Sequence, residues 1–320
     1  HRITLDTVPQ QELSRLADYG FDAVWLMGIW ERSPVAREIA KVRQTLQKPY
    51  RKALPDFTPE DVSGSPYAIL DYRVDPSFGG DVALAGLRQR LQDLGLRLIL
   101  DFVPNHMAID HPWLNTRSEL FMKGNPSDLN QNPYNYFQMK DDVFAYGRDP
   151  YFDGWPDTVQ LDYRLSDTRQ AMTDLLPEIA ARCDGVRCDM AMLVNHDIFQ
   201  RTWGGVFDTP GAEFWLEAIT VVKKAHPDFL MMAEVYWDLE YTVQQMGFDF
   251  AYDKRLYDRL MHEDADSVRD HLKADPAYHS RLVRFVENHD EPRITGIGIN
   301  RSKRYIKKLW MVNKKRILAF

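Results

Sequence analysis

Residues 184–191, DGVRCDMA, place an arginine and a carboxylate two positions apart. Alternate residues of a β-strand project from the same face, so Arg187 and Asp189 would share one face of such a strand. An acidic side chain buried beside apolar neighbours costs free energy unless it is paired or functional. Asp189 could cap the next helix and pair with Arg187, or it could carry out chemistry. This segment alone fits both interpretations.

Three further segments have the same construction, with polar residues directly after an apolar run. They are residues 101–106 with Asp101, Asn105 and His106, residues 233–235 with Glu234, and residues 285–290 with His289 and Asp290. Active sites of (β/α)₈ barrels lie at the carboxyl ends of the strands. Four such segments on one rim favour an active site over four separate structural ion pairs.

The elements that must position these residues repeat along the chain as a helix, a glycine and an apolar strand. Gly20 ends a helix over 9–19 before a strand at 21–27, and Gly95 ends a helix capped by Asp81 before a strand at 96–103. Further helices are predicted from Ser166, with a kink at Pro177, and over about 211–225. Further strands are predicted at 184–189, 229–234, 248–253 and 282–287. This order is typical of α/β proteins with a parallel sheet and predicts a (β/α)₈ TIM barrel.

Two long excursions interrupt the repeat, over residues 30–80 and 105–162, and both are rich in aromatic residues and proline. Loops of this length in a compact domain are usually functional. Aromatic side chains suit sugar faces and other flat ligands, although local packing explains most of them.

Composition excludes several other classes of function. The net charge is −7, and because residues 301–320 hold eight Lys and Arg but no Asp or Glu, the rest of the chain is still more acidic. We therefore expect no nucleic-acid partner. No apolar run is long enough to cross a bilayer, so we expect no membrane partner. Cys183 and Cys188 are too far apart along one strand to bridge, and with no signal-peptide pattern this favours a reduced, cytoplasmic protein.

The four segments resemble, in order and spacing, the four motifs of the α-amylase family, glycoside hydrolase family 13. They read DFVPNH at 101–106, GVRCDMA at 185–191, AEV at 233–235 and FVENHD at 285–290. Residues 160–163, QLDY, weakly resemble a fifth motif. The resemblance covers about residues 9–295 and includes the long excursion after the third strand, where the family inserts its domain B.

The resemblance implies a retaining mechanism, in which two carboxyl groups flank the glycosidic bond. Asp189 is implied as the nucleophile, Glu234 as the acid/base and Asp290 as a third catalytic carboxylate. Burial of Glu234 after an apolar run would favour its protonated form. The implied substrate-binding residues are Tyr67, Asp101, His106, Arg187, His289, Tyr236 and Trp237. The substrate would be an α-1,4-linked oligosaccharide, an α-glucan.

Departures from the family pattern bear on specificity and on metal binding. Met192 and Leu193 follow the nucleophile motif where many α-amylases have Lys-His, and Tyr236 and Trp237 are expected to form a stacking wall instead. Asn105 matches a calcium ligand of the family, but its partners in the insertion cannot be placed. We expect no required cofactor and keep calcium as a candidate ligand.

We therefore expect a catalytic barrel over residues 1–104 and 163–300, a domain B-like insertion over 105–162 and a basic C-terminal segment over 301–320. The family's first strand, its eighth strand and its C-terminal β domain have no counterpart here, so we expect incomplete barrel ends. The leading hypothesis is a glycoside hydrolase. A transglycosylase or glucosyl isomerase of the same family, and a non-catalytic relative that acts as a binding or scaffold subunit, are the alternatives. The oligomeric state is left open.

Overall fold

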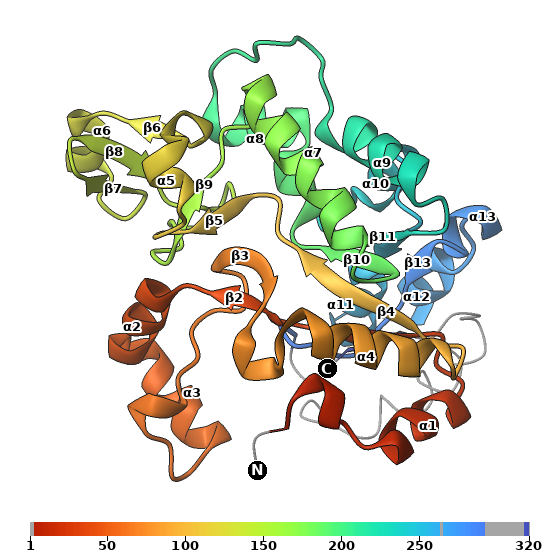
Figure 1. The fold of residues 1–320 in the computed structure, drawn as a ribbon. Coiled ribbons are helices and arrows are strands. Elements are labelled where there is room, and N and C mark those ends of the chain that lie inside the picture. The colour runs from red at the N-terminus through yellow and green to blue at the C-terminus, as the bar shows by residue number, and fades with distance from the viewer. Residues whose placement is uncertain (1–2, 263–264, 292–316, 320) are drawn as a thin grey trace.

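A single parallel sheet forms the centre of the computed structural model, which describes residues 3–262, 265–291 and 317–319. In the described part of the chain the sheet has seven strands in the order β13-β12-β11-β10-β4-β1-β14 (Figure 1). The strands are β1 (Ala23–Leu26), β4 (Arg97–Phe102), β10 (Gly185–Cys188), β11 (Leu230–Ala233), β12 (Phe250–Tyr252), β13 (Leu282–Val283) and β14 (Ile317–Ala319). From β1 to β13 each strand pairs with the next strand of the repeat, as in a singly wound barrel.

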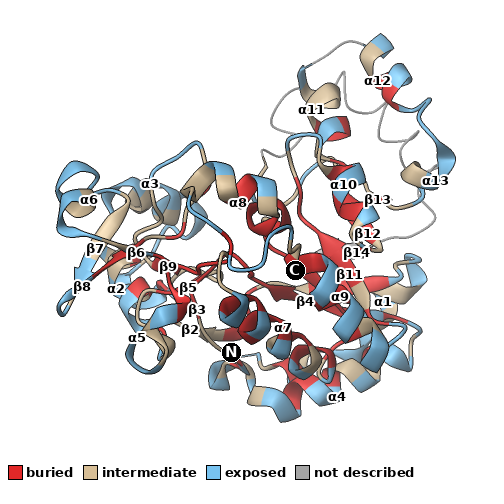
Figure 2. Cartoon of the chain, turned by 90° about the horizontal axis from the view of Figure 1, so that it is seen from above, coloured by how far each residue is buried: buried red, intermediate tan, exposed pale blue. Residues whose placement is uncertain are grey.

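Helices follow the strands and cover the outside of the sheet, so that the central strands are buried beneath exposed helical faces (Figure 2). The helices outside the two excursions are α1 (Gln10–Asp18), α4 (Gly80–Gln92), α7 (Ser166–Ala180), α8 (His196–Trp203), α9 (Phe214–Ala225), α10 (Glu240–Gln245), α11 (Lys254–His262), α12 (Ala265–His271) and α13 (Pro276–His279). Trp215 of α9 packs edge-on against Phe102 and Phe248, which joins this helix layer to the sheet. No helix among the described residues is both long enough and apolar enough to cross a membrane.

The predicted fold class is confirmed: this is an α/β fold with the strand order of an incomplete (β/α)₈ barrel. Each of the six predicted strands overlaps an observed strand. Three details were wrong. The strand predicted over residues 282–287 covers only Leu282–Val283. The helix predicted over 211–225 begins only at Phe214. The cap of α4 is Gly79 rather than Asp81, because the chain enters this helix through a left-handed turn, with φ of 96° at Gly79, that a glycine adopts without strain.

Within the described residues, β13 and β14 lie at the two edges of the sheet and do not pair with each other. β14 pairs in parallel with β1, in the register Ala23 to Ile317. The sequence reasoning missed this strand, which is only three residues long. The rest of the predicted basic segment, residues 301–316 and 320, lies outside the described residues.

Two excursions from the barrel stand beside the sheet's carboxyl ends (Figure 1). Residues 30–80 contain an antiparallel pair of strands, β2 (Trp30–Arg32) and β3 (Ile69–Val74), and the α-helices α2 (Pro34–Val42) and α3 (Gln44–Ala53). Two 3₁₀ helices, Pro59–Asp61 and Pro76–Phe78, lie in the same range. Residues 105–162 contain α5 (Trp113–Thr116), α6 (Pro126–Gln131), β5 (His106–Ala108), β6 (Lys123–Gly124), β7 (Tyr136–Met139), β8 (Asp142–Ala145) and β9 (Thr158–Gln160). β5 pairs with β9, so the second excursion leaves and rejoins the barrel at adjacent points. Its assignment as a separate domain stays a prediction.

Candidate active site

The side chain of Arg187 is the centre of the site. It projects from β10 and is fully buried, and the parallel register places it opposite Asp101 of β4 and Met232 of β11. Its Nη1 atom lies 2.7 Å from Asp189 Oδ1 and 3.4 Å from Asp101 Oδ1. Its Nη2 atom lies 2.7 Å from Glu234 Oε2. One guanidinium therefore contacts carboxyl groups from three neighbouring strand ends.

Glu234 follows β11 directly, and both of its carboxyl oxygens have hydrogen-bond donors. Oε1 accepts from the Tyr236 hydroxyl at 2.6 Å, and Oε2 accepts from the Met190 backbone N–H at 2.7 Å. Met190 adopts a left-handed conformation, with φ of 42°, which is uncommon for a residue other than glycine. This turn after β10 directs the Met190 N–H at Glu234 and fixes the orientation of the carboxyl group.

Asp189 pairs with Arg187 but caps no helix, because the short 3₁₀ helix that follows, Ala191–Val194, has no side-chain cap. The structural interpretation of Asp189 was therefore right about the ion pair and wrong about the cap. Burial raises the pKa of Asp189, and the nearby Arg187 charge opposes that rise. Burial likewise raises the pKa of Asp101, to about 6.

Three buried carboxyl groups, Asp101, Asp189 and Glu234, thus face one buried cation. Full ionisation of all three would leave an uncompensated negative charge in a medium of low dielectric constant. Burial accordingly raises the pKa of Asp101 and of Asp189, so these two carboxyl groups bind a proton more readily than they would in water.

A cavity of about 580 Å³ opens above these groups. Asp189, Glu234, Tyr236, Tyr67 and Asp290 line it, together with His106. Its volume is in the range of small-molecule sites. Arg187 and Asp101 are buried and are not among the lining residues. Arg187 contacts the carboxyl groups, and Asp101 contacts Arg187.

His106 comes from β5, at the carboxyl end of β4, and its ring packs edge-on against Trp155 at a centroid distance of 5.1 Å. Burial lowers the pKa of His106 to about 4, although a hydrogen bond with the Tyr67 backbone opposes this shift. His106 is therefore neutral at physiological pH. A neutral imidazole can donate one hydrogen bond to a sugar hydroxyl and accept another.

His289 is not among the residues that line the cavity, but it contacts two that are: its Nε2 atom lies 2.6 Å from the Tyr67 hydroxyl and 3.0 Å from Asp290 Oδ2. The His289 ring also packs edge-on against Trp25 of β1 at 5.3 Å. Burial raises the pKa of Asp290, but the hydrogen bond from His289 and the nearby charges outweigh it, so the pKa of Asp290 lies below its usual value. This carboxyl group is ionised and half-exposed in the cavity, and it does not contact Arg187.

Trp237 does not line this cavity. Its ring packs edge-on against Tyr151, from the second excursion, at 5.1 Å, and both rings are partly exposed. Trp237 and Asp238 both adopt positive φ angles, of 63° and 62°. Two consecutive non-glycine residues with positive φ indicate a backbone conformation that the surrounding structure holds in place.

Sequence reasoning missed part of the cavity wall. The first excursion contributes Ile39 and Ala40 from α2, Arg43 from the junction of the two helices, and Leu46 and Tyr50 from α3. The second excursion contributes Trp155, Asp157 and Thr158. The only signal in the sequence was the unusual length and aromatic content of the two excursions.

Asn105, the candidate calcium ligand, is buried, and its Oδ1 atom accepts a hydrogen bond from Gln160 Nε2 at 3.0 Å. Among the described residues no group of three or more His, Cys, Asp and Glu side chains is placed to hold a metal ion. The side chains around Asn105 therefore do not form a ligand set for a calcium ion.

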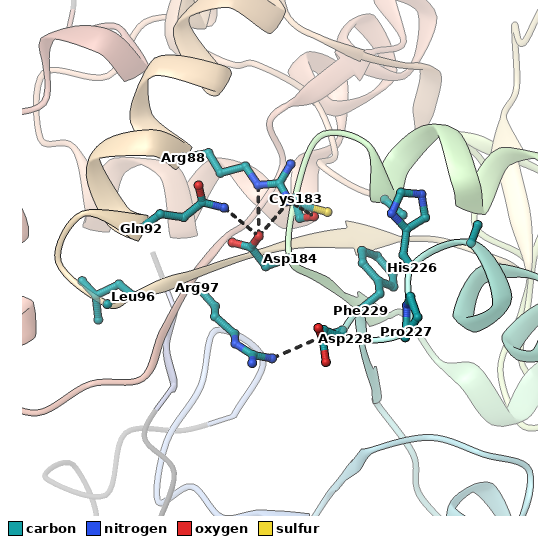
Figure 3. Close-up of a pocket in the computed structure, with 13 residues that line it drawn as sticks. Arg88, Gln92, Leu96, Arg97, Cys183, Asp184, His226, Pro227, Asp228 and Phe229 are labelled. Atoms are coloured by element: carbon teal, nitrogen blue, oxygen red, sulfur yellow. Dashed lines mark hydrogen bonds and ion pairs between the residues drawn. The ribbon is translucent and has the colours of Figure 1, made fainter.

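A second cavity, of about 500 Å³, lies at the other end of the sheet (Figure 3). Arg88 donates to Asp184 Oδ1 at 2.7 and 3.0 Å and to the carbonyl oxygen of Cys183 at 2.7 Å. Asp184 also accepts from Gln92 and from the Leu98 N–H. These polar groups satisfy one another and join α4 to the start of β10. Residues at this end of a barrel usually serve stability.

Known proteins resemble this chain in sequence and in fold. The family described as alpha amylase, catalytic domain, matches residues 10–318. Amino acid transporter heavy chain SLC3A1 of Mus musculus is 38% identical over 65 residues, which cover 20% of this chain and 8% of the relative. Alpha-amylase MalA of Haloarcula japonica is 25% identical over 211 residues, which cover 63% of this chain and 27% of the relative.

The crystal structure of an alpha-amylase from Lactobacillus plantarum has a TM-score of 0.65 and 24% identity to this chain, and the match covers 99% of this chain and 67% of that structure. At this identity the likeness shows the fold alone. The chain spans only a minor part of the length of both relatives described above. Since the family match extends over nearly the whole chain, the resemblance inferred from the motifs is confirmed, and this protein belongs to the alpha-amylase family.

Proposed function

We propose that this chain is the catalytic part of a retaining glycoside hydrolase that acts on α-1,4-linked glucose oligosaccharides. The observation that carries the proposal is that Asp189 and Glu234 share one buried guanidinium at 2.7 Å each and both line one cavity. Two carboxyl groups bridged in this way are close enough to flank a single glycosidic bond. A close pair is what double displacement requires.

In the proposed first step, a carboxylate oxygen of Asp189 attacks the anomeric carbon while Glu234 gives its proton to the leaving oxygen. The glycosidic bond breaks and a glycosyl ester of Asp189 forms. In the second step Glu234 takes a proton from water, the water oxygen attacks the same carbon, and the ester bond to Asp189 breaks. Arg187 keeps Asp189 ionised and oriented for attack, since a guanidinium holds two carboxyl groups in fixed geometry.

The remaining residues would bind the sugar. Asp290 and His106, which line the cavity, present a carboxylate and an imidazole to sugar hydroxyls, and the Tyr67 ring offers an apolar face. His289, although predicted to bind substrate, is not in the lining, and we propose that it positions Asp290 and Tyr67 instead. Arg187 and Asp101, although predicted to bind substrate, are not among the residues that line the cavity. We propose instead that Arg187 positions Asp189 and Glu234, and that Asp101 positions Arg187.

Trp237 is proposed to contact the leaving part of the substrate. It lies three residues after Glu234, which protonates the leaving oxygen, and its exposed ring meets Tyr151 outside the cavity. A longer oligosaccharide would reach this aromatic pair and a short one would not.

The same covalent intermediate also serves a transglycosylase or glucosyl isomerase, in which a sugar hydroxyl replaces water. Which acceptor reacts depends on the shape of the two excursions around the cavity. Mechanistically, no bound cofactor is needed for either reaction.

A binding or scaffold subunit is a second candidate function. The observation that favours it is the 38% identity to a protein named as a transporter heavy chain. Its stretch covers only 20% of this chain, however, and Asp189, Glu234 and Asp290 are all present and face one cavity. Catalysis is therefore the better-supported proposal.

Proton NMR of the purified protein with maltooligosaccharides tests these alternatives. Shorter products released as the α-anomer would support retaining hydrolysis, and longer products or new linkages would support transfer. First release of the β-anomer would contradict the double displacement. The absence of turnover in a cooperatively folded protein would favour the binding subunit.

A further inference from the structure

The buried side chain of Gln160 has an unusual set of partners. Its Nε2 atom lies 2.9 Å from the carbonyl oxygen of Asn105, 3.0 Å from Asn105 Oδ1 and 3.0 Å from the carbonyl oxygen of Leu161. An amide nitrogen has two hydrogens, so three oxygens converge on a group with two protons to share. Convergence of side-chain and backbone oxygens on one point is also how proteins bind Ca²⁺.

The orientation of this amide is fixed at its other end. Gln160 Oε1 accepts a hydrogen bond from the backbone N–H of Arg148 at 3.4 Å, and the whole residue is 0% exposed. The reversed amide would point an oxygen at three other oxygens, so the hydrogen-bond network assigns nitrogen to this position.

We propose that the Gln160 amide performs in this protein the role that a bound cation performs where oxygens converge in this way, and that the protein needs no calcium for stability. The three contacts have hydrogen-bond lengths, whereas Ca²⁺ would draw oxygens to about 2.3–2.6 Å. The nearest acidic residue in sequence, Asp162, is already paired with Arg164 at 2.6 Å. Among the residues that the structure describes, no group of three or more His, Cys, Asp and Glu side chains is placed to hold a metal ion.

The contacts of Gln160 connect two parts of the chain that build the site. Gln160 is the last residue of β9, and Asn105 lies between β4 and β5, next to His106 in the cavity wall. The Leu161 N–H also donates to the Asn105 carbonyl oxygen at 3.3 Å. Gln160 is thus a positioning residue that holds the start and the end of the 105–162 excursion together.

The proposal does not depend on the proposed catalytic function, because its test measures stability. Thermal unfolding of the wild-type protein would be followed by circular dichroism after EDTA treatment and again with millimolar CaCl₂. We expect the same melting temperature in both conditions. A higher melting temperature with CaCl₂ than with EDTA would overturn the proposal.

Two variants sharpen the test. Gln160→Leu removes the side-chain donor from three buried acceptors, of which the Asn105 carbonyl oxygen keeps the Leu161 N–H as a donor. We therefore expect a lower melting temperature that CaCl₂ does not restore. Gln160→Glu replaces the donor with a carboxylate among three oxygens, so we expect a lower melting temperature in EDTA that CaCl₂ raises again. Gln138→Glu, an exposed change in the same excursion, controls for added charge.

If Gln160→Leu is as stable as the wild type, the amide does not hold the two ends of the excursion together. That result would also overturn the proposal. If Gln160→Glu does not fold, the wild-type comparison and Gln160→Leu still decide. Isothermal titration of CaCl₂ into the wild type gives an independent readout, with no binding heat expected.

Discussion

Replacing Asp101 with asparagine should stabilise this protein at neutral pH, although Asp101 lies at the centre of the site. The side chain is 1% exposed, and its hydrogen bonds are long: 3.4 Å to Arg187 Nη1 and 3.3 Å from the Gly28 N–H. Asp189 and Glu234 have the closer contacts with the same guanidinium. Placing three carboxyl groups around one cation costs free energy, and much of that cost therefore comes from the burial of Asp101.

The size of the effect follows from the pKa. Burial raises the pKa of Asp101 from 3.8 to about 6, which corresponds to about 3 kcal/mol against the ionised form. Since the folded state binds this proton more tightly than the unfolded state, stability falls as pH rises from about 4 to about 6 and stays lower above that. Asparagine removes the charge and weakens two long hydrogen bonds, which costs about 1 kcal/mol. The net gain is about 2 kcal/mol at pH 8, or about 3 °C in melting temperature for a chain of 320 residues.

Thermal unfolding of wild type and Asp101→Asn between pH 4 and pH 8 measures this directly. The variant should melt higher at pH 8, and the difference should shrink toward pH 4, where the wild-type carboxyl group is protonated. Asp184→Asn is a matched control, because Asp184 accepts short hydrogen bonds from Arg88 and Leu98, and its replacement should lower the melting temperature. Asp101→Asn melting below the wild type at pH 8, or a difference that does not change with pH, would refute the reasoning.

Three further predictions concern catalysis. Asp189→Asn should lower kcat at least about a thousandfold with little change in melting temperature, and a variant that keeps most of its activity would exclude Asp189 as the nucleophile. Glu234→Gln should lower kcat about 10²- to 10⁴-fold on maltooligosaccharides, but far less on aryl glucosides, whose good leaving groups need no acid. Equal losses of kcat on both substrates would argue against Glu234 as the acid. Trp237→Ala should raise KM about fivefold for long oligosaccharides, from about 1 kcal/mol of lost aromatic contact, and leave short activated substrates unaffected. An equal change in KM for short and long substrates would show that Trp237 does not bind the leaving part.

The strands and the carboxyl groups at their ends were predictable because the signal is local. Alternation in residues 186–189 indicated that Arg187 and Asp189 share a face, and apolar runs ending in polar residues indicated the other strand ends. The contact of Arg187 with Glu234 was not predictable from these patterns, because it depends on the register between β10 and β11. Register is set by pairing across the whole sheet and not by either strand alone.

The cavity wall formed by α2 and α3 was missed for a different reason. These helices lie in an excursion without the repeating helix, glycine and strand pattern, and α3 contains Pro49, which is unfavourable inside a helix. Tertiary contacts such as Arg37 with the carbonyl oxygen of Val62 hold this segment together. Single-sequence patterns do not report such contacts.

Gln160 shows how a weak motif can carry information that only geometry reveals. In the sequence it was one residue of a four-residue stretch with a faint family resemblance. Its three acceptors come from Asn105 and Leu161, and the distance of Asn105 along the chain gave no reason to connect them.

The central claim is that Asp189 forms a covalent bond to the substrate sugar, and trapping that intermediate tests it most directly. The protein would be incubated with a fluorinated glucosyl fluoride, which slows breakdown of the glycosyl ester, and then analysed by intact mass and peptide mapping. We predict the mass of one fluorinated sugar on the tryptic peptide that begins at Cys188, with fragmentation placing it on Asp189. An adduct on another residue, or an enzyme that turns over the reagent without any adduct while it hydrolyses maltooligosaccharides, would contradict the account.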